Sequence, residues 1–341
     1  MKILPMLRLK LCITVFIALL LSQYLKASEV SESDSLALVA LYNGTNGANW
    51  VKSDNWLTGS LESWYGLVFE DGKVVAINLS GNNLNGELPD ELYQLTDLMY
   101  VYVSFNSISG SIKSGISNLS KLEVLWASNN NISGVLPSAI GDVDSLKTLY
   151  LNSNKINGTL PASIGQLSKL EHINLANNEL SGELPSSIGN LSNLRYLTLS
   201  NNMFSGAIPS SVQNLTKLKA FCIDYNKFDE IPDLSGIPEL KNSSELNEFK
   251  IQYNYFDFTD LAKNKAALGA EANYFPQRAF VLTNLYNLHP GDKIDFNMPG
   301  MSHVDTSDVR NTYRYIADNI EVQAWSGDSE YSISSAIYKD N

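Results

Sequence analysis

The sequence predicts an α/β solenoid in which short parallel strands line a concave face and 3₁₀ or extended segments form the convex side. Two observations lead to this fold class. Leucine-like residues recur every 24 residues along the middle of the chain, and each interval carries an Asn and a Gly at fixed positions. A helical segment with a cluster of tryptophans precedes the repeats, and a segment rich in β-branched and aromatic residues follows them. We therefore expect stacked coils with a helical cap before them and β-strands after them.

Composition restricts what the chain can be. It has 341 residues, of which 44% are hydrophobic and 18% are charged, which excludes a disordered, collagen-like or coiled-coil chain. The net charge of −12 argues against nucleic acid as the main partner, because phosphate binding requires a basic face. With three histidines and two cysteines, the chain is neither a zinc finger nor a disulfide-rich scaffold.

Residues 1–27 are typical of a secretory signal peptide. They carry four basic residues and no acidic ones, and the apolar run from Leu11 to Leu21 is shorter than the roughly 20 residues that span a bilayer. Ala27 is the preferred cleavage point, and an uncleaved N-terminal anchor is the alternative. No other stretch is long and apolar enough for a transmembrane helix. We expect a protein that is secreted or held at the cell surface.

Residues 28–73 are expected to form the N-terminal cap of the solenoid. Asp34 is the predicted N-cap of a helix that runs from Leu36 to Tyr42. A turn cluster follows, and then come the three tryptophans Trp50, Trp56 and Trp64. We interpret the tryptophans as packing residues.

Residues 74–262 contain about eight repeats of 24 residues. The units begin at a leucine-like position, namely Val74, Leu98, Leu122, Leu146, Leu170, Leu194 and Leu218, with a last, irregular unit near Leu246. The LxL tripeptide of each unit predicts a short strand, the Gly permits a positive φ after the turn, and the Pro fixes an extended convex segment. A buried Asn in each unit is predicted to bond backbone groups, which gives a ladder of Asn82, Asn106, Asn130, Asn154, Asn178, Asn202, Asn226 and Asn254.

The unit pattern LxxLxLxxNxLxGxLPxxLxxL resembles the plant-type class of leucine-rich repeats with its LxGxIP signature. The string ALVALYNGTNGANW…NWLTG…WYGL resembles the N-terminal cap of that class, but it lacks the cysteine pair that usually flanks the Trp-x-Gly stretch. This departure is closest to bacterial, Bacteroidetes-like secreted or surface proteins, in which an immunoglobulin-like domain follows the repeats. The resemblance implies a binding protein built on leucine-rich repeats.

After a linker at residues 263–275, residues 276–341 resemble part of an immunoglobulin-like domain. Five strands are expected, at Ala279 to Leu282, Lys293 to Asn297, Thr312 to Ile316, Glu321 to Trp325 and Tyr331 to Ile337. These 66 residues fall short of the roughly 100 of a complete sandwich, so the segment is expected to be truncated. A small native β-cap is the alternative.

The concave face is the candidate binding site, because the strand positions that point outward are rich in aromatic residues. The predicted ligand-binding residues are Tyr100, Tyr102, Phe105, Trp126, Tyr150, His172, Tyr196 and Tyr225. Exposed aromatic side chains on a rigid sheet supply contact area at low entropic cost. Neighbouring polar residues, Ser80, Ser104, Ser128, Asn152 and Ser200, could bond a polar ligand. The alternative is that the rings only stabilise the sheet by stacking on one another.

The sequence carries no catalytic signature. It contains no G-x-S-x-G, phosphate-binding loop, HExxH or paired-cysteine motif, and His172, His289 and His303 lack metal-ligand spacing. We expect no catalytic residues, no metal site and no cofactor. The predicted function is extracellular, non-enzymatic recognition of a protein, peptide or polysaccharide, as in adhesion or surface recognition. Two alternatives are a targeting or scaffold module of a larger secreted enzyme or multidomain surface protein encoded beyond Asn341, and a structural adhesin repeat without a single ligand.

Overall fold

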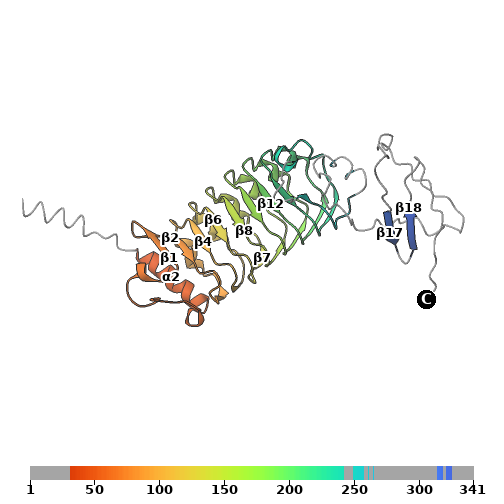
Figure 1. The fold of residues 1–341 in the computed structure, drawn as a ribbon. Coiled ribbons are helices and arrows are strands. Elements are labelled where there is room, and N and C mark those ends of the chain that lie inside the picture. Colours follow the sequence, from red (N-terminus) through yellow and green to blue (C-terminus); the bar gives the residue numbers. More distant parts are fainter. Residues whose placement is uncertain are drawn as a thin grey trace, which may run out of the picture.

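The computed structural model describes residues 31–241 and 249–256, the single residues 260 and 264, and two strands at 313–317 and 320–324. The predicted signal peptide at 1–27 and most of the chain after residue 264 lie outside the described residues. Figure 1 shows stacked coils in which strands β2, β4, β6, β8 and β12 lie side by side. Among the described residues, no helix has the length and apolarity needed to cross a bilayer.

The N-terminal cap begins with helix α2 (Glu32–Gly44), which starts earlier than predicted. Its N-cap is Ser31, whose hydroxyl accepts a hydrogen bond from the Asp34 amide at 3.1 Å. The prediction of Asp34 as the N-cap was wrong: Asp34 lies in the first turn, where its carboxylate accepts a bond from the Ser31 hydroxyl. Ser31 and Asp34 thus form a capping pair. The Ser31 hydroxyl accepts a hydrogen bond from the Asp34 amide and donates one to the Asp34 carboxylate.

The three tryptophans pack together behind this helix, as expected. Tyr42, Trp50, Trp56 and Trp64 form what we call the cap cluster, with neighbouring ring centroids 4.7 to 5.8 Å apart. The tryptophan rings are buried, and each indole N–H donates to a backbone carbonyl. Gly47 permits this packing, because a Cβ there would lie 2.2 Å from the Tyr42 ring. The short helices η1 (Gly47–Asn49) and η2 (Leu61–Ser63) connect the cap to the first strand.

The coils build a nine-stranded sheet, here called the main sheet. Its first pair is antiparallel, and the strands that follow are parallel. In spatial order the strands are β1 (Leu67–Glu70), β2 (Lys73–Asn78), β4 (Tyr100–Tyr102), β6 (Val124–Trp126), β8 (Thr148–Tyr150), β10 (His172–Asn174), β12 (Tyr196–Thr198), β14 (Ala220–Cys222) and β16 (Phe249–Lys250). From β2 to β14, residues 24 apart in sequence pair across neighbouring strands, for example Tyr102 with Trp126. The period therefore sets the register.

Each regular coil continues into a second strand and a 3₁₀ helix. A second, five-stranded parallel sheet contains β7 (Ser133–Val135), β9 (Lys155–Gly158), β11 (Glu179–Gly182), β13 (Met203–Ala207) and β15 (Lys227–Glu230), while β3 (Asn85–Glu87) pairs with β5 (Ser107–Ser109). The 3₁₀ helices are η3 (Asp90–Gln94), η4 (Ser114–Asn118), η5 (Ser138–Asp142), η6 (Ala162–Gln166), η7 (Ser186–Asn190), η8 (Ser210–Asn214) and η9 (Glu239–Lys241). The expected pattern of parallel strands and 3₁₀ segments is thus confirmed.

The residue before each regular 3₁₀ helix is Pro in five coils and Lys113 in the sixth. Proline suits this position because it has no N–H to satisfy and favours the observed extended backbone. Lys113 does carry an N–H, and that group donates to the Tyr93 hydroxyl at 3.2 Å. The tyrosine, which is buried against Gly115, compensates for the missing proline.

The core is one continuous stack of apolar side chains, from Leu38 in the cap to Phe256. Beside it runs a line of Asn side chains, one in each coil. The Asn130 amide, for example, donates to the Val103 and Ala127 carbonyls at 2.9 and 3.1 Å, and its oxygen accepts from the Ile108 N–H at 2.9 Å. Equivalent bonds recur from Asn106 to Asn254 and join each turn to its neighbour. Asn82 instead bonds the backbone of Lys52 in the cap.

Near the C-terminal end, Asn264 adds a bond pattern that the sequence analysis did not predict. Its amide donates to the Pro232 carbonyl, and its oxygen accepts from the Leu234 N–H. Farther along, β17 (Tyr313–Ala317) and β18 (Ile320–Ala324) form an antiparallel pair close to two of the predicted strands. The other three predicted strands lie outside the described residues, so the immunoglobulin-like domain remains a prediction.

Candidate binding face

Six of the eight predicted ligand-binding side chains lie together on the outward face of the main sheet. They come from strands β4, β6, β8, β10 and β12, and the inward residue between each outward pair belongs to the core. We call them the aromatic row: Tyr100, Tyr102, Trp126, Tyr150, His172 and Tyr196. Trp126 is the most open, with 39% of its surface exposed. Within the part of the chain that the structure describes, its indole N–H has no hydrogen-bond partner.

The rings of the aromatic row contact one another in sequence but do not share a plane. Tyr100 stacks on Tyr102 at one end with planes 6° apart, and His172 stacks on Tyr196 at the other end, also at 6°. Between them the planes turn sharply. Trp126 is inclined by 58° to Tyr102 and by 89° to Tyr150. The centre of the row is therefore angular, whereas its ends are stacked.

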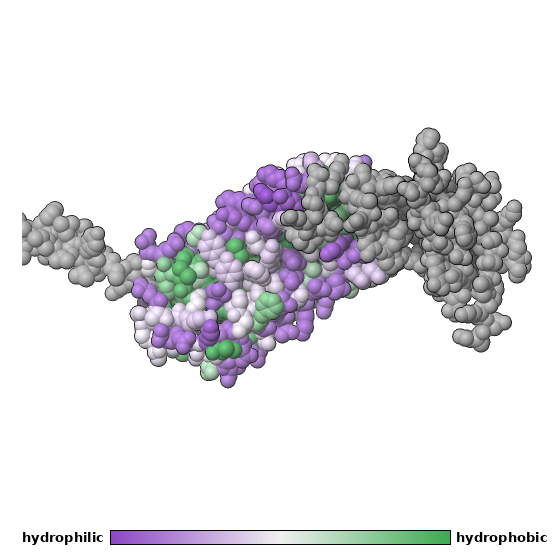
Figure 2. All heavy atoms as spheres, viewed as in Figure 1, coloured by the Kyte–Doolittle hydropathy of each residue, from purple (hydrophilic) through white to green (hydrophobic). Residues whose placement is uncertain are grey.

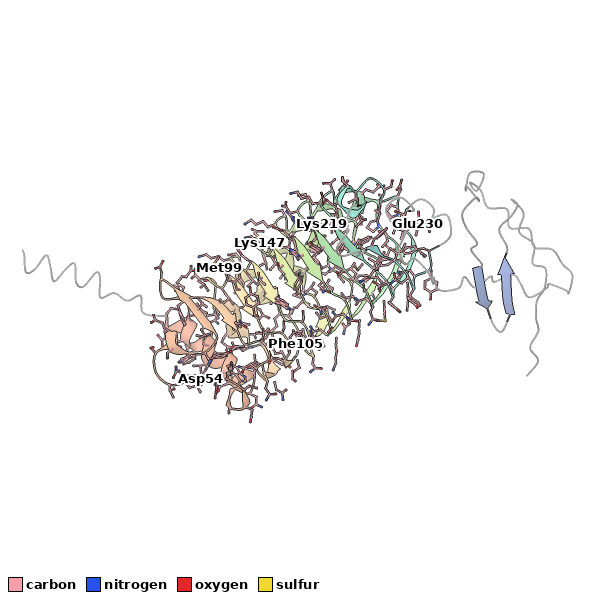
Figure 3. The ribbon with its side chains drawn as sticks, viewed as in Figure 1. Asp54, Met99, Phe105, Lys147, Lys219 and Glu230 are labelled. Carbon is pink, nitrogen blue, oxygen red and sulfur yellow. The ribbon has the colours of Figure 1, made fainter. Side chains whose placement is uncertain are left out.

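A row of alternating charges flanks the strands where they begin. It consists of Glu123, Lys147, Glu171 and Arg195, which we call the charged margin. Lys147 binds Glu123 at 2.9 Å, and Arg195 binds Glu171 at 3.4 Å. Figure 3 shows Met99, Lys147 and Lys219 along this margin and Phe105 away from it. The sequence analysis missed these residues, although their spacing of 24 and alternating sign could have revealed them.

The charged margin is connected to the row electrostatically. The Tyr100 hydroxyl donates to Glu123 at 3.3 Å, and the negative charge of Glu123 raises the pKa of Tyr100. His172 follows Glu171, and its ring nitrogen Nδ1 lies 3.4 Å from the Tyr150 hydroxyl. Partial burial lowers the pKa of His172, with Arg195 adding to the effect and Glu171 opposing it. His172 is therefore neutral at neutral pH.

The other two predicted residues, Phe105 and Tyr225, lie outside the aromatic row. Both adopt positive φ at the turn that follows a strand. Phe105 is 65% exposed, and among the described residues it stacks on no other ring. Tyr225 stacks on Tyr253 at 4.1 Å, and a hydrogen bond between the two raises the pKa of Tyr225. The structure therefore does not bring these two residues together with the other six.

Several polar residues beside the row, which were expected to hydrogen-bond a ligand, instead bond other groups of the protein. Ser104 and Ser128 are buried; they donate to the Trp126 carbonyl and to the Asn152 side chain. Ser200 donates to Asp224. Cys222, in the same outward column as Trp126, is also buried. The accessible part of the face thus narrows to the aromatic row and its charged margin.

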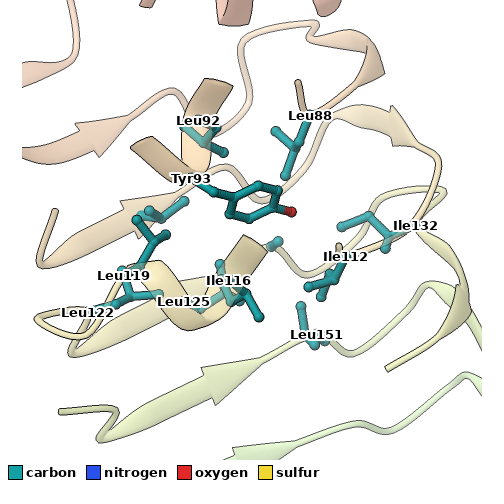
Figure 4. Close-up of a pocket in the computed structure, with 12 residues that line it drawn as sticks. Leu88, Leu92, Tyr93, Ile112, Ile116, Leu119, Leu122, Leu125, Ile132 and Leu151 are labelled. Atoms are coloured by element: carbon teal, nitrogen blue, oxygen red, sulfur yellow. The ribbon is translucent and has the colours of Figure 1, made fainter. Parts of the chain in front are cut away.

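The core beneath the aromatic row contains a small cavity. A cavity of about 20 Å³ lies among apolar side chains that include Val101, Leu125 and Ala127, the first two of which come from strands β4 and β6 (Figure 4). Ala127 occupies a position that is leucine in the next three coils, so missing side-chain volume accounts for the cavity. Its wholly apolar lining would keep it dry. It is too small and too enclosed by the core to be a ligand site.

The surface seen in Figure 2 carries both hydrophilic and hydrophobic residues. On the face seen in Figure 2, hydrophobic residues form separate patches among hydrophilic and intermediate ones. No group of three or more His, Cys, Asp or Glu side chains is placed to hold a metal ion in the described segments. The arrangement offers aromatic faces, one free indole donor and paired charges, which are the groups that bind a ligand non-covalently.

The fold and this face define a solenoid repeat protein with an exposed aromatic sheet. Three family models identify the type of repeat. A leucine-rich repeat region model matches residues 127–255, and leucine rich repeat models match residues 96–156 and 73–95. The chain is a leucine-rich repeat protein over these residues. No curated protein sequence matches it. The closer resemblance to bacterial surface proteins and the immunoglobulin-like domain remain predictions.

Three solved structures share the fold. The PEPR1–AtPEP1 structure has a TM-score of 0.58 and 26% identity, covering 67% of this chain and 36% of the matched chain. The Arabidopsis receptor kinase HAESA, in complex with the peptide hormone IDA and the co-receptor SERK1, has a TM-score of 0.50 and 34% identity, covering 54% and 30%. The plant peptide hormone receptor RGFR1, in complex with RGF2, has a TM-score of 0.50 and 28% identity, covering 61% and 37%. The chain spans about a third of the length of each of these matched chains.

Proposed function

We propose that this protein is an extracellular, non-catalytic recognition protein that binds an extended peptide segment along the aromatic row. The observation that carries the proposal is the row itself: six neighbouring rings across five strands, with Trp126 half-exposed and its indole N–H available. Parallel strands bonded in register hold these rings in place before any ligand arrives. A preorganised surface loses little conformational entropy on binding, which favours affinity.

The dimensions of the row define the length of ligand that it would hold. Strands β4 to β12 are separated by four inter-strand spacings of about 4.8 Å, which gives a row about 19 Å long. An extended peptide rises about 3.3 Å per residue, so about six residues would cover the row. A peptide of this length buries enough surface for specific but moderate affinity.

Two observations favour a peptide over a polysaccharide. The central rings are inclined by 58° and 89°, so the row offers no flat platform on which successive sugar rings would stack. Angular aromatic surfaces suit the irregular side chains of a peptide. The structural relatives support the same choice, because HAESA and RGFR1 were solved as peptide-hormone receptors.

The extracellular placement is supported by the signal-peptide pattern of residues 1–27 and by the similarity to receptor structures. Recognition by non-covalent contacts alone is supported by the groups present on the row. An adhesin, or a module that targets a larger secreted protein, would use the same face. These roles would differ in the ligand profile, which would be broad and weak for a structural adhesin.

The test is a peptide and glycan array probed with the purified chain, followed by measured dissociation constants for the selected ligand. Trp126→Ala and Tyr150→Ala should each weaken a selected peptide about 30-fold, because a truncated aromatic hot spot costs about 2 kcal/mol or more. Phe105→Ala is the matched control, since it removes an even more exposed ring outside the row. Equal losses in all three variants, or none in the row variants, would contradict the proposal. Selection of glycans alone would also contradict it.

A further inference from the structure

The charged margin has an order of signs that its bonds within the chain do not require. Lys147 binds Glu123 at 2.9 Å and Arg195 binds Glu171 at 3.4 Å, so each ion pair joins two neighbouring coils. Both bonds could form equally well if one pair ran in the opposite direction. In both pairs, however, the acidic residue belongs to the earlier coil. The signs along the margin are therefore negative, positive, negative, positive.

The same polarity recurs beside the margin. Asp97 pairs with Lys121, and Asp90 pairs with Lys113 at 2.8 Å, again with the acid earlier in the chain. A further ion pair, which involves helix η9 after the last regular coil, has the reverse order. The ion pairs between regular coils thus form dipoles that point in one direction along the stack of coils.

A margin with this order of signs is complementary to itself. A two-fold axis between Lys147 and Glu171 would reverse the margin of a second copy, and evenly spaced strands would keep the two rows in step. Glu123 then faces Arg195 of the second copy, and Lys147 faces Glu171 of the second copy. If one pair ran the other way, the same axis would place like charges opposite each other.

The neighbouring positions agree with this two-fold arrangement. In the column two residues before the margin, the axis brings Asp97 opposite Lys217 of the second copy. The other opposed positions of that column combine a lysine with an uncharged side chain, namely Lys121 with Asn193 and Lys169 with Ser145. At the ends of the margin column, Met99 faces Lys219. Like charges therefore do not meet along these two columns.

The charged margin remains accessible to a second copy, because its ion pairs are only partly covered. The side chains of Lys147 and Arg195 are 45% and 44% exposed, and that of Glu171 is 40% exposed. Exposed ion pairs are individually weak, but on association each charge of the margin gains a second partner of opposite sign. A surface of this kind gives a weak dimer whose stability depends on salt.

We propose that the charged margin is a self-association surface, through which two copies of this chain pair about a two-fold axis with their strands in opposite order. The partner is a second copy because reversal of the margin is the operation that matches its signs. The paired residues belong to the margin and not to the aromatic row. A dimer therefore carries two rows, whatever ligand they bind, and a ligand with two recognised segments would bind it with added avidity.

The first test measures the mass of the purified full chain by sedimentation equilibrium, at concentrations up to about 1 mM. The net charge of −12 repels two copies over long range, so the salt concentration is about 0.1 M, where a Debye length of about 10 Å screens distant charges but not contacts. The average mass should rise with concentration toward that of a dimer. At about 1 M salt, where the Debye length is about 3 Å, it should return toward that of the monomer. A monomer under both conditions, or tighter association at the higher salt, would overturn the proposal.

Two charge reversals then separate pairing between copies from an effect within one chain. Lys147→Glu and Glu171→Lys each place like charges opposite each other across the axis, so each variant alone should associate at least about tenfold more weakly. An equimolar mixture should recover the association, because the new glutamate of one variant faces the new lysine of the other. Lys155→Glu, on the second sheet, is the matched control and should change association by less than about twofold. Circular dichroism checks that each variant folds.

General charge repulsion predicts a different pattern. Glu171→Lys makes the net charge less negative, so repulsion alone would strengthen association in this variant, whereas pairing through the margin weakens it. Stronger association of Glu171→Lys, or a mixture no more associated than its two components, would overturn the proposal. Equal weakening by Lys147→Glu and Lys155→Glu would also overturn it.

Discussion

The cap cluster and the aromatic row use the same kinds of side chain at similar distances, but in different environments. Ring centroids lie 4.7 to 5.8 Å apart in the cluster and 4.8 to 6.5 Å apart in the row. Every indole in the cluster is buried and donates to a backbone carbonyl, whereas Trp126 is half-exposed and unpaired among the described residues. Ring contacts alone therefore do not distinguish packing from recognition. Burial and the partner of the indole N–H do.

The difference follows from the local backbone. In the cap, loops and short helices fold over the rings of Tyr42 and the tryptophans and bring carbonyls to the indole nitrogens. In the row, a parallel sheet satisfies its own backbone groups, and the outward side chain of Trp126 stays 39% exposed. The cluster stabilises the first coil, and the row leaves its surface for a partner.

The largest expected effect separates the two regions by stability. Trp56→Ala should lower the free energy of unfolding by about 3–5 kcal/mol, because it empties a buried site and leaves the Tyr65 carbonyl without its donor. Trp126→Ala should cost less than about 1 kcal/mol, since its ring is half-exposed. Urea unfolding of both variants measures the difference. Similar losses in the two variants would mean that the row is also a packing element.

A second prediction concerns the Asn side chains that hold the coils beneath both regions. Asn226→Ala should destabilise by about 2–3 kcal/mol, because it orphans the Leu199 and Ile223 carbonyls and the Phe204 N–H. Asn214→Ala, at an exposed Asn of the preceding coil, is the control and should cost about 0.5 kcal/mol or less. Thermal or urea unfolding checks both, and equal effects would show that the buried amide is not a structural bridge.

A third change acts under the row without touching it. Ala127→Val adds two methyl groups beside the cavity of about 20 Å³. At about 24 cal/mol per Å³, filling it should add about 0.5 kcal/mol of stability. Peptide affinity should stay unchanged, because the outward rings are unaltered. A loss of affinity with unchanged stability would show that the underlying packing tunes the row.

The smallest effect is a pH dependence that only the row should show. Burial lowers the pKa of His172, so this residue stays neutral below its ordinary pKa of 6.5 before it gains a proton. The unfolded chain takes up that proton more readily, so stability should fall as pH drops below about 6.5. The new positive charge lies two strands from Trp126, about 10 Å at about 4.8 Å per strand, and should weaken the binding of a peptide with a basic side chain about twofold. Titrations at several pH values compare the natural chain with His172→Gln, in which the step at acidic pH should vanish.

Much of this arrangement could be predicted from the 24-residue period, because a constant register carries each outward position from strand to strand. The column of Tyr102, Trp126 and Tyr150 is such a case. Ring inclination depends on rotamers and neighbours, and no sequence pattern encodes it. The burial of Ser104 and Cys222, both at nominally outward positions, likewise depends on the covering side chains and not on strand alternation.

The helix cap and the charged margin were missed for a different reason. Ser31 and Asp34 are both good capping residues, and only backbone geometry shows which hydroxyl or carboxylate accepts the bond. The charged margin of Glu123, Lys147, Glu171 and Arg195 also follows the 24-residue period, but only the structure shows that these charges pair across neighbouring strands. A search for alternating charge at the repeat spacing would have found them.

The aromatic row, and not the cap cluster, is proposed to contact the ligand. The most direct measurement is the indole N–H region of a nitrogen-15 NMR spectrum, assigned by single tryptophan replacements and recorded while an array-selected peptide is added. We expect the Trp126 signal to shift with the peptide concentration, while the signals of Trp50, Trp56 and Trp64 stay in place. A bound peptide that moves the cap signals and leaves Trp126 unchanged would contradict it.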